Sequence, residues 1–162
     1  DYPSVMDAVD RYIIRHRMER LNSDLELKDN ITRALFKVSG GHGGLLRRSF
    51  LPVAAKRKTL GEARDDAFPS DDLLDELLRN AGVATECQTI YFSLPRAEQE
   101  TLCDIVNKQY VANQLALQNL VDKHLVVDTV NRPYVKLPLL HRYVYRLMPP
   151  NDAGQNATGP SK

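Results

Sequence analysis

The most chemically suggestive residues of this 162-residue chain are cationic, and five of them fall within the segment 47–58. They are Arg47, Arg48, Lys56, Arg57 and Lys58. A mobile basic segment can neutralise phosphate groups without a defined fold. Four glycines around His42 and a proline at position 52 interrupt regular patterning here, so residues 39–69 are expected to form a flexible linker or loop. Two interpretations stay open, a plain linker and an electrostatic contact to nucleic acid. The order Arg47-Arg48-Ser49 also resembles a substrate site for a basophilic protein kinase.

Residues suited to catalysis or metal binding are present but scattered. The histidines show no metal-type spacing, and no serine lies in a nucleophile elbow. Cys87 and Cys103 are expected to be buried reduced thiols, although Cys103 and His124 could meet in space as nucleophile and base. We therefore expect a non-enzymatic protein without a cofactor or metal. The four histidines are His16, His42, His124 and His141.

Composition sets the broad class. Hydrophobic residues make up 43% of the chain, which is enough for one ordinary domain with a core. The formal net charge is only +1, so attraction to nucleic acid would have to come from local patches. No apolar run reaches the roughly 18 residues of a membrane span, and no signal pattern precedes the first helix. We expect an intracellular protein without a membrane partner, and the first residue, Asp1, suggests a piece of a longer chain.

The amino-terminal residues predict a pair of helices. Ser4 with Asp7, and later Ser23 with Glu26, carry the capping signature of a helix start. Gly40 is expected to end the second helix. The apolar stripe of the first is Val5, Val9, Tyr12 and Ile13, with His16 as a further candidate, and that of the second is Leu27, Ile31, Ala34, Leu35 and Val38.

Further helices are expected from residue 70 onward. Ser70 should cap a short leucine-rich helix that ends near Gly82, and 88–92 reads as a short strand or tight connection. Pro95 should begin another helix. We favour two helices over 96–124, with one long helix as the alternative, and a strand or short helix over 139–148.

Residues 110–137 predict a change from helix to hairpin. Leu117, Leu120, Val121 and His124 recur at helical spacing, and the next three residues, 125–127, favour an extended backbone. The turn-prone 131–133 and the strand-like 134–137 would complete the hairpin.

This order of helix, strand, turn and strand resembles the winged helix-turn-helix superfamily, over about residues 95–148. The resemblance implies that the second helix of the pair enters the DNA major groove while the wing touches the backbone or minor groove. Amides on that helix could pair with adenine. The resemblance also implies phosphate contacts from Lys108 and Lys123 at the helix ends, whereas Asp122 would repel phosphate. On the helix and the wing it thus assigns Asn113, Gln114, Gln118, Asn119, Arg132 and Lys136.

We accordingly expect a mainly α protein with a small β-hairpin (α+β). Its parts would be a helical pair over 1–38, the linker or loop over 39–69, a winged-helix-like domain over 70–148 and a disordered tail over 149–162. The expected function is that of a non-catalytic module of a larger nuclear protein that binds DNA through helix 113–123, the wing 125–137 and the basic loop. The alternative is a scaffold module that docks a partner chain through apolar helix faces such as 5–12 or 73–78. The sequence leaves the oligomeric state open.

Overall fold

The computed structural model describes residues 2–56 and 69–148. This part of the chain is mainly helical and carries one two-stranded antiparallel sheet. In chain order the elements are α1 (Tyr2–Arg15), the 3₁₀ helix η1 (Glu19–Ser23), α2 (Leu25–Ser39), α3 (Gly43–Ala55), α5 (Asp71–Leu78), α6 (Ala81–Phe92), α7 (Arg96–Val106), α8 (Gln114–Asp122), β1 (Val126–Val127), β2 (Tyr134–Val135) and α9 (Pro138–Leu147).

Helices α1 and α2 confirm the predicted amino-terminal pair, with differences at their ends. Val5, Val9 and Ile13 are buried, but His16 lies beyond the end of α1 and is exposed. The cap of α2 is Asp24, whose carboxylate accepts a hydrogen bond from the Leu27 amide at 3.0 Å. The predicted cap, Ser23, instead belongs to η1, because a 3₁₀ turn between the helices takes up the preceding residues.

Helix α3 corrects the prediction of a loop over 39–69, since 43–55 is helical and its apolar side is buried. The buried positions Leu45, Leu46, Ser49, Phe50, Val53 and Ala54 follow a helical period. The glycines and the proline concealed this period, yet Gly43 and Gly44 lie in the first turn, where the His42 side chain accepts from the Leu45 amide. Ser49 is fully buried, so the folded chain does not present it to a kinase. Residues 57–68 lie outside the described part.

Helices α5 and α6 confirm one prediction and correct another. Ser70 caps α5, where its hydroxyl accepts from the Leu73 amide at 3.3 Å. The predicted strand over 88–92 is wrong, because these residues form the last turns of α6. Gly82 does not end α5 but lies in the first turn of α6. The Asn80 side chain caps this helix by accepting hydrogen bonds from two backbone amides.

The segment from α7 to β2 forms two helices followed by a hairpin, as predicted. The break between α7 and α8 contains Lys108 at a φ of 59°, and Asn113 caps α8. Val126 pairs with Val135 across the hairpin. His124 is exposed beyond the end of α8, at a φ of 58°, so the prediction that it lies on the apolar face of this helix is wrong.

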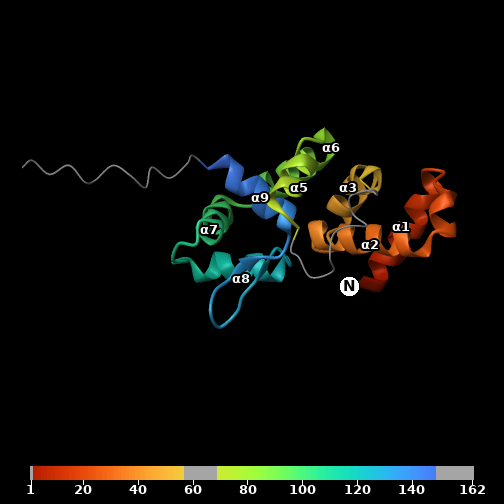
Figure 1. The fold of residues 1–162 in the computed structure, drawn as a ribbon. Coiled ribbons are helices and arrows are strands. Elements are labelled where there is room, and N and C mark those ends of the chain that lie inside the picture. The colour runs from red at the N-terminus through yellow and green to blue at the C-terminus, as the bar shows by residue number, and fades with distance from the viewer. Residues whose placement is uncertain (1, 57–68, 149–162) are drawn as a thin grey trace, which may run out of the picture.

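Helix α9 lies at the centre of the molecule. It packs against α2, α5, α6, α7 and β2, while α1–α3 occupy one end and α7, α8 and the hairpin occupy the other (Figure 1). Of the two forms predicted for 139–148, the helix is the observed one. One hydrophobic cluster includes side chains from every helix, α1 to α9, in the described part of the chain. The predicted tail over 149–162 lies outside that part.

Gly40 lies at a contact between the end of α2 and the segment that joins β2 to α9. It terminates α2 in the left-handed conformation, at a φ of 59°. A Cβ atom at this position would lie 2.5 Å from the Lys136 carbonyl oxygen and 2.7 Å from Leu137 Cδ2. The end of α2 therefore touches the backbone that joins β2 to α9.

Replacing Gly40 with Ala should lower the free energy of unfolding by more than about 2 kcal/mol, because a left-handed alanine costs about 1–2 kcal/mol and the new methyl group meets backbone. The measurement is urea unfolding followed by circular dichroism. Gly43→Ala is the matched control, since nothing lies within 4 Å of its Cβ position. We expect the control to change stability by less than about 1 kcal/mol. Equal effects in the two variants would contradict the close approach.

Candidate nucleic-acid interface

Three of the four amide side chains predicted to face the DNA bases, those of Asn113, Gln114 and Gln118, make local hydrogen bonds. Asn113 Oδ1 accepts from the Ala116 amide at 3.0 Å, as the cap of α8. Gln114 Nε2 donates to the Val111 carbonyl at 2.9 Å, and Gln118 Nε2 donates to Asp122 Oδ1 at 2.9 Å. Paired hydrogen bonds to a base need both the oxygen and the nitrogen of an amide in suitable positions. The local bonds fix one atom of each amide in another direction.

Lys123, at the end of α8, is held by an ion pair within the protein. Its Nζ donates to Glu98 Oε2 at 2.5 Å, and Glu98 is only 4% exposed. A buried carboxylate needs a partner that compensates its charge. Lys123 thus neutralises Glu98 of α7 in this structure, whereas the winged-helix resemblance implied a phosphate contact.

The β1–β2 hairpin, which was predicted to be a wing, carries the two exposed cations that were predicted there, Arg132 and Lys136. Thr129 Oγ1 shapes the turn, since it donates to the Arg132 carbonyl at 2.6 Å and accepts from the Arg132 amide at 3.2 Å. The Lys136 amide donates to the Leu125 carbonyl at 2.8 Å, which continues the hairpin pairing. Neither cationic side chain has an ion-pair partner among the described residues, so both are available to an anion.

Exposed apolar side chains surround the same wing. Tyr110 is 86% exposed, Leu115 is 74% exposed and Val130 is fully exposed. A hollow of about 450 Å³ lies between the α7–α8 break, the start of α8 and the wing, and Tyr110 and Val130 line it. Leu115 places an apolar group on the exposed side of α8. This end of the molecule is therefore more apolar and less cationic than the predicted DNA-reading surface.

The described cations of the predicted basic loop have different environments in the structure. Arg47 and Arg48 lie exposed on α3, whereas Lys56 at its end forms an ion pair with Glu76 of α5. Arg57 and Lys58 lie outside the described residues. Of the loop cations, only the first two are both described and without an acidic partner.

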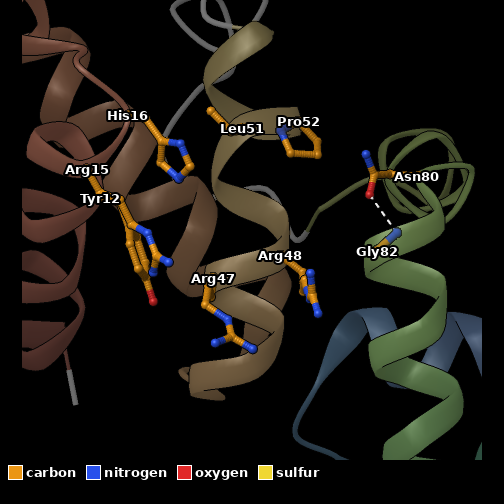
Figure 2. Close-up of a pocket in the computed structure, with 9 residues that line it drawn as sticks. All are labelled: Tyr12, Arg15, His16, Arg47, Arg48, Leu51, Pro52, Asn80 and Gly82. Atoms are coloured by element: carbon orange, nitrogen blue, oxygen red, sulfur yellow. Dashed lines mark hydrogen bonds between the residues drawn. The ribbon is translucent and has the colours of Figure 1, made fainter.

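Arg47 and Arg48 border a surface hollow of about 380 Å³ that sequence reasoning missed, and we call it the arginine hollow (Figure 2). The neighbouring helix α1 contributes a third guanidinium group, that of Arg15, and the start of α6 contributes Asn80. None of the three arginines forms an ion pair with a described residue. The full lining is Tyr12, Arg15, His16, Arg47, Arg48, Leu51, Pro52, Asn80 and Gly82.

Aromatic rings support one side of the arginine hollow. Phe50 of α3 is buried, and the rings of Tyr12 and His16 pack on it with centroid distances of 5.5 and 5.7 Å. The His16 ring is nearly parallel to that of Phe50, at 21°. Phe50 thus covers one face of the imidazole, while the residue as a whole stays exposed. An aromatic surface next to three guanidinium groups offers both stacking and charge.

The start of α6 adds a further electrostatic contribution to the hollow. Asn80 Oδ1 accepts from the amides of Gly82 and Val83, at 3.0 and 3.3 Å. Figure 2 shows this cap opposite Arg48. The positive end of the helix dipole therefore lies beside the arginines, and it favours a negative ligand.

The cysteines do not form a catalytic pair with a histidine. Cys87 is buried, and desolvation raises the pKa of its thiol to about 12, so it stays protonated at neutral pH. Cys103 Sγ lies 3.4 Å from the Tyr91 hydroxyl, which is its hydrogen-bond partner in place of the suggested His124. Over 2–56 and 69–148, no cluster of three or more His, Cys, Asp or Glu side chains is arranged to hold a metal ion.

Comparisons with known proteins identify no relative of this chain: no protein-family model, no curated protein and no solved structure matches it. Within the described ranges, no helix has both the length and the apolar character that a membrane span requires. The physical features of the surface are thus the basis for any functional assignment.

Replacing Lys123 with Met should lower the free energy of unfolding by about 1–2 kcal/mol, because Glu98 would stay buried without its partner. Thermal or urea unfolding measures the effect. The matched control, Arg96→Met, removes the exposed pair with Glu100 and should cost less than about 0.5 kcal/mol. Adding Glu98→Gln to the Lys123 variant should restore part of the loss. A Lys123 variant as stable as the control would contradict a structural role.

Proposed function

We propose that this chain is a non-catalytic module that binds DNA mainly through its phosphates, with the arginine hollow as the principal contact. The observation that carries the proposal is that three arginines line one hollow, and that none of them has a carboxylate partner among the described residues. Arg47 and Arg48 are the residues of the predicted basic segment that remain available for this role. A polyanion would relieve the mutual repulsion of the three cations and release its own counterions.

The segment α7–α8–β1–β2 is proposed to be of the winged-helix type, with a supporting role in binding. Arg132 and Lys136 on the hairpin would contact phosphates at the other end of the molecule from the arginine hollow (Figure 1). Asn113, Gln114 and Gln118 would contribute little base discrimination, because each makes a local hydrogen bond. We therefore expect binding with weak sequence preference, as part of a larger nuclear protein.

Two charge-reversal variants of equal net charge test this proposal at the two ends of the molecule. They are Arg47→Glu/Arg48→Glu in the arginine hollow and Arg132→Glu/Lys136→Glu on the wing. Fluorescence anisotropy against a mixed-sequence duplex should show a larger loss of affinity for the first pair. Each lost phosphate contact should reduce the slope of log K against log salt by about 0.9.

Salt dependence and folding provide the controls for that experiment. Circular dichroism should show unchanged helix content in both variants, since all four side chains are exposed. No binding by the wild-type chain, even at low salt, would exclude the DNA proposal. An equal loss in both variants would show that binding depends on net charge and not on the hollow.

A second candidate function, docking of a partner protein, is favoured by the exposed apolar side chains near the wing. The partner faces suggested by the sequence are not free, because Val5, Val9, Leu74 and Leu77 are buried in the core. Tyr110 and Val130 instead line one hollow together with Lys108 and Arg132, and Leu115 is a further exposed apolar residue of α8. Such a surface fits a helical segment that carries leucines flanked by carboxylates.

An amphipathic Leu- and Glu-rich helical peptide is the probe for this second function. We expect it to bind the wild-type chain and to lose most of its affinity in Leu115→Ser/Val130→Ser, because the apolar contacts are removed. Anisotropy of a labelled peptide measures both. Met6→Ser/Ile14→Ser, which changes two exposed apolar residues of α1, is the matched control. Equal affinity in the two double variants would exclude docking near the wing.

A further inference from the structure

We infer that the arginine hollow takes one nucleoside 5′-phosphate unit, either a free nucleotide or the phosphorylated end of a nucleic-acid strand. This inference rests on the proposed function and specifies the ligand of the same site. Its starting point is shape, because the cations border a concavity of about 380 Å³. That volume lies within the range of about 300–1,000 Å³ that small-molecule sites occupy. A surface that only tracks a continuous phosphate backbone needs no such concavity.

The charge of the site matches a terminal phosphate better than an internal one. A phosphate monoester carries about −1.5 to −2 charges at neutral pH, whereas each internal phosphodiester carries one negative charge. Three arginines line this single hollow, Arg15 from α1 and Arg47 and Arg48 from α3 (Figure 2). Each guanidinium can donate two parallel hydrogen bonds to phosphate oxygens. The number of donors therefore suits a group with three terminal oxygens.

The start of α6 completes the phosphate side of the hollow. Asn80 uses its oxygen to cap the helix, and its Nδ2 makes no hydrogen bond to a described residue. This amide nitrogen can donate to a phosphate oxygen next to Arg48, whose side chain extends toward the same helix start (Figure 2). The helix dipole adds to the attraction.

The opposite side of the hollow suits a nucleobase. Tyr12 and His16 pack against Phe50, which fixes the orientation of both rings. Phe50 covers one face of His16, so a base can stack on the exposed ring, and Leu51 extends the apolar surface. Stacking of a base on an aromatic side chain is tolerant of base identity. The site is thus expected to recognise a nucleotide without strong base preference.

The test compares a short labelled single strand that carries a 5′-phosphate with the same strand ending in a 5′-hydroxyl. Fluorescence anisotropy on the full chain should show at least about tenfold tighter binding of the phosphorylated strand, since the lost contacts are charge-assisted. Unlabelled adenosine monophosphate and inorganic phosphate serve as competitors. Adenosine monophosphate should displace the strand at lower concentration than phosphate does.

Variants test which side of the hollow contacts the phosphate and which side contacts the base. Arg47→Ala/Arg48→Ala should remove the preference for the phosphorylated end, whereas Arg132→Ala/Lys136→Ala, with the same loss of charge, should keep it. His16→Ala should weaken competition by adenosine monophosphate and leave that by inorganic phosphate unchanged. Circular dichroism checks that each variant is folded.

The outcomes separate this inference from the function on which it rests. Equal, salt-sensitive binding of the two strands would overturn the inference and leave the proposed DNA binding in place. No binding of either strand or of the duplex would overturn both. A preference for the phosphorylated strand without competition by adenosine monophosphate would support the strand end as the ligand. Equal competition by adenosine monophosphate and inorganic phosphate would overturn the base contact.

Discussion

The structure depends on the burial of one face of α9. Pro138, Leu139, Leu140 and Val144 of this helix lie in the core, and the helix contacts α2, α5, α6, α7 and β2. Its other side is fixed by Arg142, which donates two hydrogen bonds to the Asp75 carboxylate at 2.8 and 2.6 Å and one to Asp71 at 3.0 Å. The bond from Arg142 holds the pKa of Asp75 below its ordinary value, so the carboxylate stays charged at neutral pH. Apolar burial thus places α9, and this bidentate pair fixes its rotation relative to α5.

The placement of α3 follows from this arrangement and creates the arginine hollow. α2 contacts α9, and α3 in turn packs on α1, α2 and α6. Phe50 is buried against Tyr12 and His16, which holds α1 and α3 side by side. Arg15 from one helix therefore comes to border the same hollow as Arg47 and Arg48 from the other. Burial of Phe50 stabilises the contact between α1 and α3. This contact brings the exposed arginines together.

The two ends of the molecule have different surface chemistry. At the end formed by α1 and α3, cations without acidic partners surround an aromatic hollow, which suits phosphate and base together. Near the wing, the exposed side chains include the apolar Tyr110, Leu115 and Val130 beside the cations. Two acidic groups near the wing are held by contacts within the protein. Glu98 forms an ion pair with Lys123, and Asp122 accepts a hydrogen bond from Gln118. This distribution is why the proposed phosphate contact is assigned to α3 and not to α8.

The sequence by itself determined the elements whose signals are local. Ser70 caps α5, Gly40 ends α2, and the β-prone residues 125–127 with the turn-prone 131–133 give the hairpin. Local signals misled where packing outweighed them: glycines and Pro52 concealed α3, and the β-prone residues 88–92 form helix because α6 packs against α3 and α9. Only the tertiary structure decided which cations are free, because the pairing of Lys123 with Glu98 and of Lys56 with Glu76 joins residues distant in sequence. The arginine hollow is of the same kind, since Arg15 meets Arg47 and Arg48 only through the contact between α1 and α3.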